Sequence, residues 1–572
     1  MPKLQIQQRP FLTRPEQFQG VPPFVAEILA RRGVQSDQEL ELKLKYLLPP
    51  NLKGLDQAIA LMDQAIDQQK KIVIVGDYDA DGATSTTLMM LALRDMGANV
   101  NYLVPDRFKY GYGLTPAIAD LALQRYQPDL LITVDNGISS HAGVEQAHLH
   151  GMQVIITDHH LTTKATPDAE AVVNPNQLGC EFPSKALAGV GVAFYLLANL
   201  ASQRAKQGKS SSKLVQYLDL VALGTYADVA SLDYNNRILI DAGLKRIQQN
   251  QCRPGISALL QIASRDPRQL QAEDLGFVLG PRLNAAGRME TMDIGIECLL
   301  AVDFATAYPL AQQLNDLNLE RRQVESKIKQ DALHHLAELQ LDQQSLPAAL
   351  VLFQPHWHQG VIGIVAGRLK EQFHRPSIVF AADEDGEHIK GSARSIEGIH
   401  IRDAIERVAE QYPHLVRYFG GHAAAAGLTI RKAHFSEFQQ VFTHLIEQMD
   451  DDLFQATLWT DGVLPHPELQ LETVDLLEQL GPWGQKFPSP VFEGHFRVLD
   501  YRWLKEQHLK LRLALDTGQI VDAIGFNLRD QFDFDPMQDH VDLVYTLQRN
   551  QFNGAVSLQL QILHLAQNKN RS

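Results

Sequence analysis

The stretch Ile72-Val73-Ile74-Val75-Gly76-Asp77-Tyr78-Asp79-Ala80-Asp81-Gly82 joins four β-branched residues to three closely spaced acids. A short, continuous apolar run is typical of a strand buried on both faces of a parallel sheet. Acids just past such a strand lie at the carboxyl edge of the sheet, where open α/β folds bind their ligands. The stretch therefore predicts a buried strand followed by a binding loop.

The same arrangement recurs further along the chain. Leu131-Ile132-Thr133-Val134 precedes Asp135-Asn136-Gly137, and Val154-Ile155-Ile156 precedes Asp158-His159-His160. Another acid, Asp228, follows the apolar run Leu220-Val221-Ala222-Leu223. Because the carboxyl ends of parallel strands meet at one sheet edge, we expect the acids and histidines to lie close together.

Each of these strings has an ordinary explanation when taken alone. Residues 77–82 could form a calcium-type turn or a solvated loop, residues 158–160 a polar loop, and Asp228 a helix cap. Together they favour a site for two divalent cations, either Mn²⁺ or Mg²⁺, because Mg²⁺ prefers oxygen ligands and Mn²⁺ also accepts imidazole. Bound cations would also remove the repulsion between the acids. A carboxylate such as Asp135 can bridge two ions.

The strings and the distal Asp228 resemble the motifs of the DHH phosphoesterase superfamily. Two further motifs, residues 280–288 (GPRLNAAGR) and 391–395 (GSARS), narrow the resemblance to its bacterial single-strand-specific 5′→3′ DNA exonucleases. The resemblance covers nearly the whole chain. It implies two-metal hydrolysis of single-stranded DNA to 5′-mononucleotides, in recombination and repair. It also implies work with single-strand-binding protein and a repair helicase.

The resemblance also implies the roles of the site residues. Many superfamily members carry a histidine ligand four residues before the first Asp of the Asp-x-Asp pair; here that position is Val75, and Asp77 is the expected substitute. His160 is expected to face the scissile phosphate as an electrophile or acid, with Asp81 and Asp135 as further catalytic residues. The expected metal ligands are Asp77, Asp79, Asp81, Asp135, His159 and Asp228.

A second set of residues is expected around the 5′-phosphate and the strand backbone. Arginine forks match phosphate bidentately, and small neighbours allow close backbone approach. A surface ion pair is the alternative for each arginine, and a tight turn with a helix start is the alternative for residues 420–427. The set comprises Arg107, in a loop of basic and aromatic residues, Arg282, Asn284, Arg288, Ser392, Arg394 and His422, the last in a motif that resembles the signature of the DHH-associated domain.

The rest of the sequence predicts the fold class and the domains in which these motifs lie. Alternating strand and helix signals predict βαβ units with right-handed crossovers, and five short strands near the end suit an OB-type barrel. The fold class is therefore α/β, with a parallel-sheet DHH core, a long helix, a second α/β domain and a C-terminal OB-like β-barrel. The expected parts are an N-terminal cap at 1–69, the DHH catalytic domain at 70–305, the connecting helix at 306–344, the DHH-associated (DHHA1) domain at 345–449 and the OB-like domain at 453–566.

Bulk composition is that of an ordinary globular protein, with 572 residues, 45% of them hydrophobic and 21% charged. The net charge of −15 argues mildly against nucleic-acid binding, but metal-binding acids and local potentials soften that argument. Three widely spaced cysteines, no signal-peptide core and no long apolar run indicate a cytoplasmic protein without a membrane segment.

Two other functions fit parts of the sequence. A smaller DHH enzyme could cleave short oligonucleotides, cyclic dinucleotides or pyrophosphate, but the N-terminal cap and the C-terminal barrel argue against a small substrate. A catalytically inactive DNA-binding relative, of the kind found in replicative helicase assemblies, is the other alternative. The intact set of acids and His159 argues against it.

Overall fold

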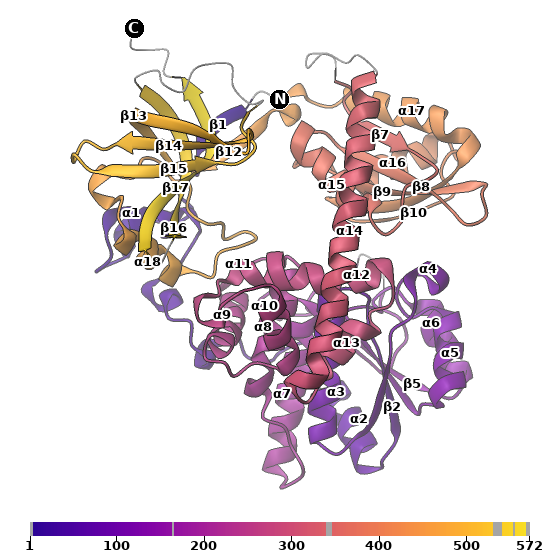
Figure 1. Cartoon of the computed structure of the whole chain (residues 1–572). Coiled ribbons are helices and arrows are strands. Elements are labelled where there is room, and N and C mark those ends of the chain that lie inside the picture. The colour runs from indigo at the N-terminus through magenta and orange to yellow at the C-terminus, as the bar shows by residue number, and fades with distance from the viewer. Residues whose placement is uncertain (1–3, 163–164, 339–345, 530–539, 553–554, 568–572) are drawn as a thin grey trace. The chain divides into compact units, whose positions relative to one another are not determined.

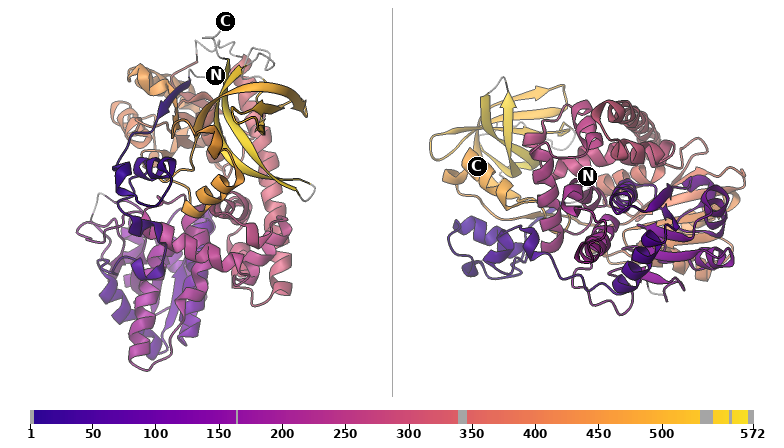
Figure 2. Two further views of the ribbon diagram at one scale, coloured as in Figure 1. Left: turned by 90° about the vertical axis from the view of Figure 1, so that its left-hand side faces the viewer. Right: turned by 90° about the horizontal axis from the view of Figure 1, so that it is seen from below.

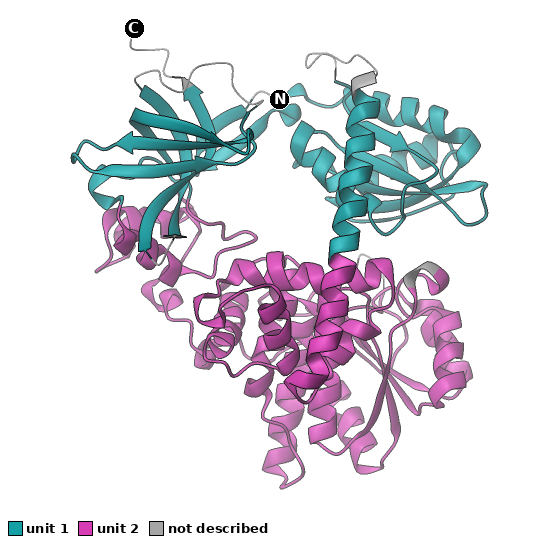
Figure 3. Cartoon of the chain, in the orientation of Figure 1, with its two compact units in different colours: residues 1–10, 319–469, 491–572 teal, residues 11–318, 470–490 magenta. Residues whose placement is uncertain are grey.

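The computed structural model describes residues 4–162, 165–338, 346–529, 540–552 and 555–567. They form two compact units, each made of separate segments of the chain (Figure 3). One unit comprises residues 11–318 and 470–490, and the other comprises residues 1–10, 319–469 and 491–572. Among the described residues, none of the helices has the length and apolar character needed to cross a membrane.

A five-stranded parallel sheet, in the order β3-β2-β4-β5-β6, organises the first unit. Three of its strands are those predicted from the apolar runs before the acid motifs. All five are β2 (Lys71–Val75), β3 (Asn99–Leu103), β4 (Leu130–Val134), β5 (Gln153–Thr157) and β6 (Ala171–Val173).

The sheet is buried on both faces because alternate residues of each strand enter two different cores. Ile72 and Ile74 pack with α2 (Leu55–Asp67), α3 (Ala80–Asp95), α7 (Gly189–Lys206) and α8 (Leu218–Ala227). Val73 and Val75 pack on the other face with α5 (Pro116–Tyr126) and α6 (His141–Leu149). Figure 1 shows α2 and α3 on one side of the sheet and α5 and α6 on the other, and Figure 2 gives two further views of these layers. This burial fixes where each strand ends and therefore where the following acids lie.

Further helices complete the first unit. A π-helix, η6 (Leu275–Leu279), runs directly into α12. The remaining α-helices are α1 (Pro23–Arg31), α4 (Arg107–Tyr110), α9 (Tyr234–Gln248), α10 (Pro254–Ile262), α11 (Ala272–Asp274), α12 (Gly280–Met289), α13 (Asp293–Leu300) and the long α14 (Phe304–Glu338), which continues into the second unit.

Residues 470–490, with α18 (Leu471–Leu480), return from far along the chain to the first unit. Arg237 of α9 is 2% exposed. Its guanidinium lies 4.0 Å from the centre of the Phe487 ring and donates to the Leu480 carbonyl at 3.1 Å. Burial lowers the pKa of Arg237 to about 10. The returning segment thus covers this buried cation with an aromatic ring and a carbonyl.

The second unit contains a mixed sheet in the order β10-β11-β9-β8-β7. Only β7 and β8 are parallel, and the other neighbours are antiparallel. The strands are β7 (Leu350–Phe353), β8 (Ser377–Ala382), β9 (His388–Arg394), β10 (Tyr418–Gly421) and β11 (Ala425–Arg431), with α15 (Ile362–Phe373), α16 (Ile401–Gln411) and α17 (Phe435–Glu447).

The C-terminal strands close into a barrel in the order β13-β14-β15-β17-β16. Leu509, Leu511 and Leu513 alternate inward along β14 and are fully buried. The barrel strands are β13 (Phe492–Leu504), β14 (His508–Ala514), β15 (Ile520–Gly525), β16 (His540–Phe552) and β17 (Ala555–Gln567), while β1 (Leu4–Gln8) pairs in parallel with β12 (Ala456–Thr460). The predicted fold class is confirmed.

Candidate metal centre

The loops after β2, β4 and β5 carry the predicted acids and histidines to one edge of the sheet. Asp79 caps α3, and its Oδ1 accepts hydrogen bonds from the backbone amides of Asp81 at 2.9 Å and Gly82 at 3.0 Å. Asp135 follows β4 with φ of 62°, a left-handed conformation that is uncommon outside glycine and often found at functional sites. Asp228 caps the C-terminus of α8.

His159 lies at the centre of the resulting cluster. Its Nε2 is 3.1 Å from Asp135 Oδ1, 3.8 Å from Asp228 Oδ2 and 4.0 Å from Asp81 Oδ2. Within the part of the chain that the structure describes, three groups of side chains have ligand atoms within 4.8 Å of one another. These groups are Asp135 with His159 and His160, Asp81 with His159 and Asp228, and Asp77 with Asp79 and Asp135.

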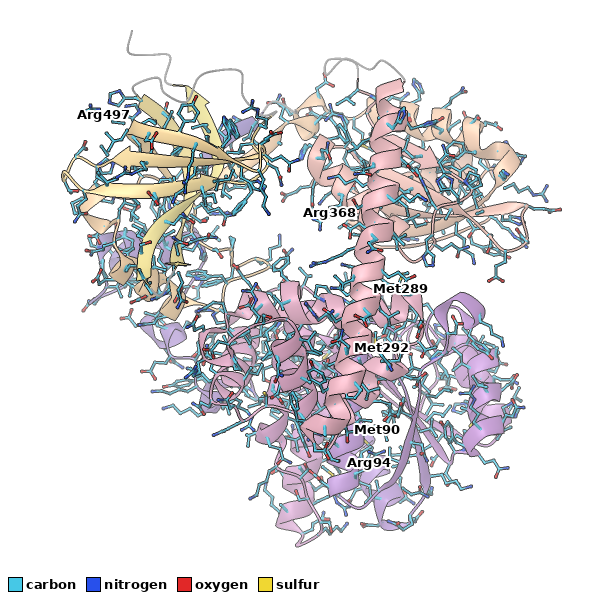
Figure 4. All side chains as sticks on the ribbon, viewed as in Figure 1. Met90, Arg94, Met289, Met292, Arg368 and Arg497 are labelled. Atoms are coloured by element: carbon cyan, nitrogen blue, oxygen red, sulfur yellow. The ribbon has the colours of Figure 1, made fainter. Side chains whose placement is uncertain are left out.

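Two glycines allow helices to approach this cluster closely. A Cβ at Gly287 of α12 would lie 1.9 Å from the Tyr78 carbonyl oxygen, and one at Gly189 would lie 2.6 Å from Asp135 Cβ. Gly189 also donates its amide to Asp81 Oδ2 at 2.6 Å. Met292, labelled in Figure 4, packs 3.2 Å from the same Gly287 position. Residues 280–288 therefore belong to a helix that packs against the loop of Asp77, Tyr78 and Asp79, called the acid loop below.

The acids strongly oppose one another's ionisation. Burial, and then the charge of Asp79, raises the pKa of Asp81 to about 7. Burial and the charge of Asp81 raise the pKa of both Asp135 and Asp228 well above the usual range. Burial, followed by the neighbouring His160, lowers the pKa of His159 to about 4, so this ring is neutral and able to donate a lone pair.

Two buried polar atoms at the centre of the cluster fit a metal ion. Asp135 Oδ1 and His159 Nε2 are buried and lie 3.1 Å apart, yet neither forms a hydrogen bond with any group of the described residues. Buried polar atoms are normally satisfied, so such orphans require an explanation. Carboxylate oxygens with one neutral imidazole are the donor set that Mn²⁺ accepts, and a carboxylate-rich set suits Mg²⁺.

Asp158 organises the histidine pair, a role that the sequence motif did not reveal. Its Oδ1 lies 2.7 Å from His160 Nδ1, while its Oδ2 accepts the Ile138 amide at 2.9 Å. Burial would raise the pKa of Asp158, but the hydrogen bond and charge of His160 lower it. Burial would lower the pKa of His160, but Asp158 outweighs it and raises this pKa to about 9. The Tyr112 hydroxyl also lies within 3.4 Å of the His160 ring nitrogens.

The predicted DNA contacts of the first unit lie mainly on α12. Asn284 Oδ1 accepts the Ala80 amide at 2.7 Å and so holds the start of α3. The Arg282 guanidinium donates to the Val278 carbonyl at 2.7 Å and to Asn315 Oδ1 at 3.2 Å. Arg288 is partly exposed near the end of α12. The side chain of Arg107 is outside the described residues.

The predicted contacts of the second unit gather on β9 and β11. Ser392 and Arg394 lie opposite Gly427 and Ala425. An Arg394 Nη donates to Ser392 Oγ at 3.1 Å. A Cβ at Gly363, in the first turn of α15, would lie 2.8 Å from Ser392 Oγ and 3.0 Å from an Arg394 Nη. His422 lies in the β10–β11 turn, so residues 420–427 form a hairpin and not the alternative of a turn with a helix start.

Three models of known protein families match this chain, one each to its DHH, DHH-associated and barrel regions. Matching family models are the DHH family N-terminal domain over residues 71–225, the DHHA1 domain over residues 346–448 and the RecJ OB domain over residues 460–564. The single-stranded-DNA-specific exonuclease RecJ of Dickeya dadantii is 49% identical over 556 residues, covering 96% of each chain.

Solved structures give the same result. RecJ from Thermus thermophilus in complex with Mn²⁺ matches with a TM-score of 0.83 and 30% identity, over 99% of this chain and 80% of that one. The same protein in complex with Mg²⁺ matches with a TM-score of 0.78 and 29% identity, over 99% of this chain and 79% of that one.

Proposed function

The chain belongs to the RecJ family of single-stranded-DNA-specific exonucleases, and from this premise we propose how its residues perform the reaction. The chain is a metal-dependent nuclease that hydrolyses phosphodiester bonds of single-stranded DNA. It degrades the strand in the 5′→3′ direction, releases 5′-mononucleotides and serves recombination and repair. The observation that carries the proposal is the buried cluster with unpartnered atoms on Asp135 and His159.

Hydrolysis is assigned to the acid–histidine cluster. When bound, two Mn²⁺ or Mg²⁺ ions supply an activated water and stabilise the charge of the leaving oxygen. Asp135 is placed to share in holding the ions with the neighbouring acids and His159, because its carboxylate belongs to two of the three groups. The residues that would hold the ions are Asp77, Asp79, Asp81, Asp135, His159 and Asp228.

His160 is assigned the role of proton-bearing donor to the scissile phosphate. The hydrogen bond that His160 Nδ1 donates to Asp158 Oδ1 fixes the orientation of the ring, and the Asp158 charge keeps it protonated. A cation near the phosphate stabilises the charge that grows on the phosphoryl oxygens. Asp158 acts through His160 and is a positioning residue.

Recognition of a phosphate is assigned to Ser392 and Arg394 together with the N-terminus of α15. Backbone amides at a helix N-terminus attract anions, and Gly363 places this terminus against both side chains. Burial lowers the pKa of Arg394, which is consistent with a guanidinium that a bound phosphate would compensate. We assign the 5′-phosphate to these residues, and strand contacts to Arg107, Arg282, Arg288 and His422. Asn284 acts by holding the start of α3.

Partners and location follow from the family. We propose that the enzyme acts with single-strand-binding protein and a repair helicase. We also propose that it works in the cytoplasm, which suits its three free cysteines. The domain boundaries predicted from the sequence remain part of the proposal, with hydrolysis in residues 70–305 and additional strand binding in the barrel.

The decisive experiment is digestion of end-labelled single strands blocked at either the 5′ or the 3′ end, in Mn²⁺ or Mg²⁺. We expect mononucleotides from a strand with a free 5′-phosphate, no products in EDTA, and slow cleavage of matched duplex. Equal digestion of strands blocked at the 5′ end would refute the assigned polarity. Activity that survives EDTA would refute the metal assignment.

A further inference from the structure

Phe277 is a large aromatic side chain left 73% exposed within the π-helix η6. π-helical turns are rare and often occur at functional sites. This turn runs without a break into α12, so Phe277, Pro281, Asn284 and Arg288 follow one another at helical spacing. Asn284 reaches the acid loop by accepting the Ala80 amide. The Phe277 ring therefore lies on the face of this helix that leads to the metal centre.

Contacts of two glycines place η6 across the end of α8. A Cβ at Gly276 would lie 2.7 Å from the Tyr226 ring, and one at Gly280 would lie 3.0 Å from Ala227 Cβ. The next residue after Ala227 is the predicted ligand Asp228. The exposed ring of Phe277 is thus carried by a turn that packs directly beside a residue of the cluster.

Val229 follows Asp228 and is strained. The Val229 amide donates to the Tyr226 carbonyl, and the Ala230 amide donates to the Thr225 carbonyl, as in a Schellman helix ending. Val229 occupies the position of this motif that favours glycine, with φ of 60°, and its side chain is 63% exposed. A β-branched residue in this conformation is a true outlier, and such outliers cluster at functional sites. Because the Val229 side chain is largely exposed, burial does not explain a strained β-branched residue at this position.

We propose that Phe277, carried by the turn that packs beside the end of α8 where Asp228 and Val229 follow, is an apolar platform on which one base of the single strand stacks. Stacking would hold the neighbouring phosphodiester in place for hydrolysis, so Phe277 is a positioning residue. This inference rests on the proposed exonuclease function. It names a contact to a base, in addition to the contacts to phosphate assigned above.

The surroundings favour a nucleic-acid base as the occupant. Arg282 and Arg288 lie on the helix that continues from Phe277, and exposed Lys486 lies on the segment whose Trp483 carbonyl accepts the Tyr226 hydroxyl at 2.9 Å. Single-strand channels interleave aromatic and basic residues in this way. Every base has a stackable face, so this grip would let the enzyme degrade strands of any sequence.

The test measures whether the contribution of the Phe277 ring to the rate depends on one particular base of the strand. The kcat/KM for hydrolysis is measured with 5′-phosphorylated single strands that carry one abasic residue at each of the first eight or so positions in turn. Wild type is compared with Phe277→Ala, Phe277→Trp and the control Leu149→Ala, which removes an apolar side chain that is 75% exposed on α6. A thermal melt and Mn²⁺ binding by calorimetry accompany each variant.

We expect Phe277→Ala to lower kcat/KM about 5- to 150-fold, the range of base–aromatic stacking. At one position, the abasic residue should slow wild type by a similar factor and leave Phe277→Ala unaffected. Phe277→Trp should retain the wild-type pattern, as should Leu149→Ala, and Mn²⁺ binding should be unchanged in all variants. A result in which wild type degrades the strands, but every abasic residue slows wild type and Phe277→Ala by the same factor, would refute the platform and leave the exonuclease assignment intact. If wild type does not degrade single strands, the proposed function itself fails.

Discussion

Removing metal should make the first unit less stable as the pH rises, and the contribution of Asp81 to this effect can be worked out. The pKa of Asp81 is about 7 in the folded chain and 3.8 in a reference peptide. A carboxyl whose pKa is raised by folding contributes stability below the unfolded pKa and loses it as the pH rises through the folded value. The full loss between pH 4 and pH 7 is about 4 kcal/mol, at about 1.4 kcal/mol for each pKa unit.

About half of this loss, roughly 2 kcal/mol, falls between pH 5.5 and pH 8, because ionisation of the unfolded chain is complete at the lower pH. For a unit of this size, the corresponding drop in Tm is about 3 °C. The measurement is a thermal melt of EDTA-treated protein, followed by circular dichroism across this pH range. Added Mn²⁺ should raise Tm far more at pH 8 than at pH 5.5, because ligands must be deprotonated to bind metal.

Two variants separate the cluster from other buried acids. Asp81→Asn should reduce the pH dependence of metal-free Tm, to which Asp135 and Asp228 still contribute, and should abolish the response to Mn²⁺. Asp219 is buried outside the cluster, where burial raises its pKa to about 6, so Asp219→Asn should leave the Mn²⁺ response intact. A metal-free Tm that rises from pH 5.5 to pH 8, or an Asp81→Asn slope equal to that of wild type, would refute this account.

Four other outcomes are expected. Asp135→Ala should abolish hydrolysis in Mn²⁺ and Mg²⁺ while circular dichroism shows a preserved fold; near-wild-type rates would show that Asp135 takes no part in the reaction. Arg394→Ala should lower the rate ratio between strands with 5′-phosphate and 5′-hydroxyl, by up to about a hundredfold if the strand shifts by ~1 Å; an unchanged ratio would make it a general backbone contact. Val229→Gly should raise metal-free stability by about 1 kcal/mol through relief of the left-handed strain, seen as a higher denaturation midpoint, and a lower midpoint would contradict that strain. A chain ended at Pro490 should still cleave but bind strands more weakly in a filter-binding assay; normal binding without cleavage would reverse the roles of core and barrel.

The edge of the sheet that carries the acids and histidines was predictable because strands buried on both faces have continuous apolar sequences. Strands β2, β4 and β5 read as continuous apolar runs, and each is followed at once by acids or histidines. The barrel was equally visible as short strands separated by turn residues. In both cases local sequence and long-range packing point to the same structure.

Other features depend on contacts that no local pattern encodes. Residues 280–288 were expected to bring backbone close to a ligand, whereas they form α12, whose Gly287 approaches the Tyr78 carbonyl. The pairing of β1 with β12 joins segments that lie far apart in the chain. Asp158 was part of a recognised motif, but its partner His160 became clear only from the 2.7 Å contact between them.

The return of residues 470–490 to the first unit has a consequence for synthesis on the ribosome. The first unit cannot complete its packing when residue 318 emerges, because Phe487 and the Leu480 carbonyl, which cover Arg237, are still to be translated. At elongation rates of about 5–20 residues per second, the interval between residues 318 and 490 is roughly 10 to 35 s. Throughout that interval the growing chain carries Arg237 without this cover. A fragment that ends before residue 490 would therefore lack this packing, and we expect it to be cleaved by proteases faster than the full chain.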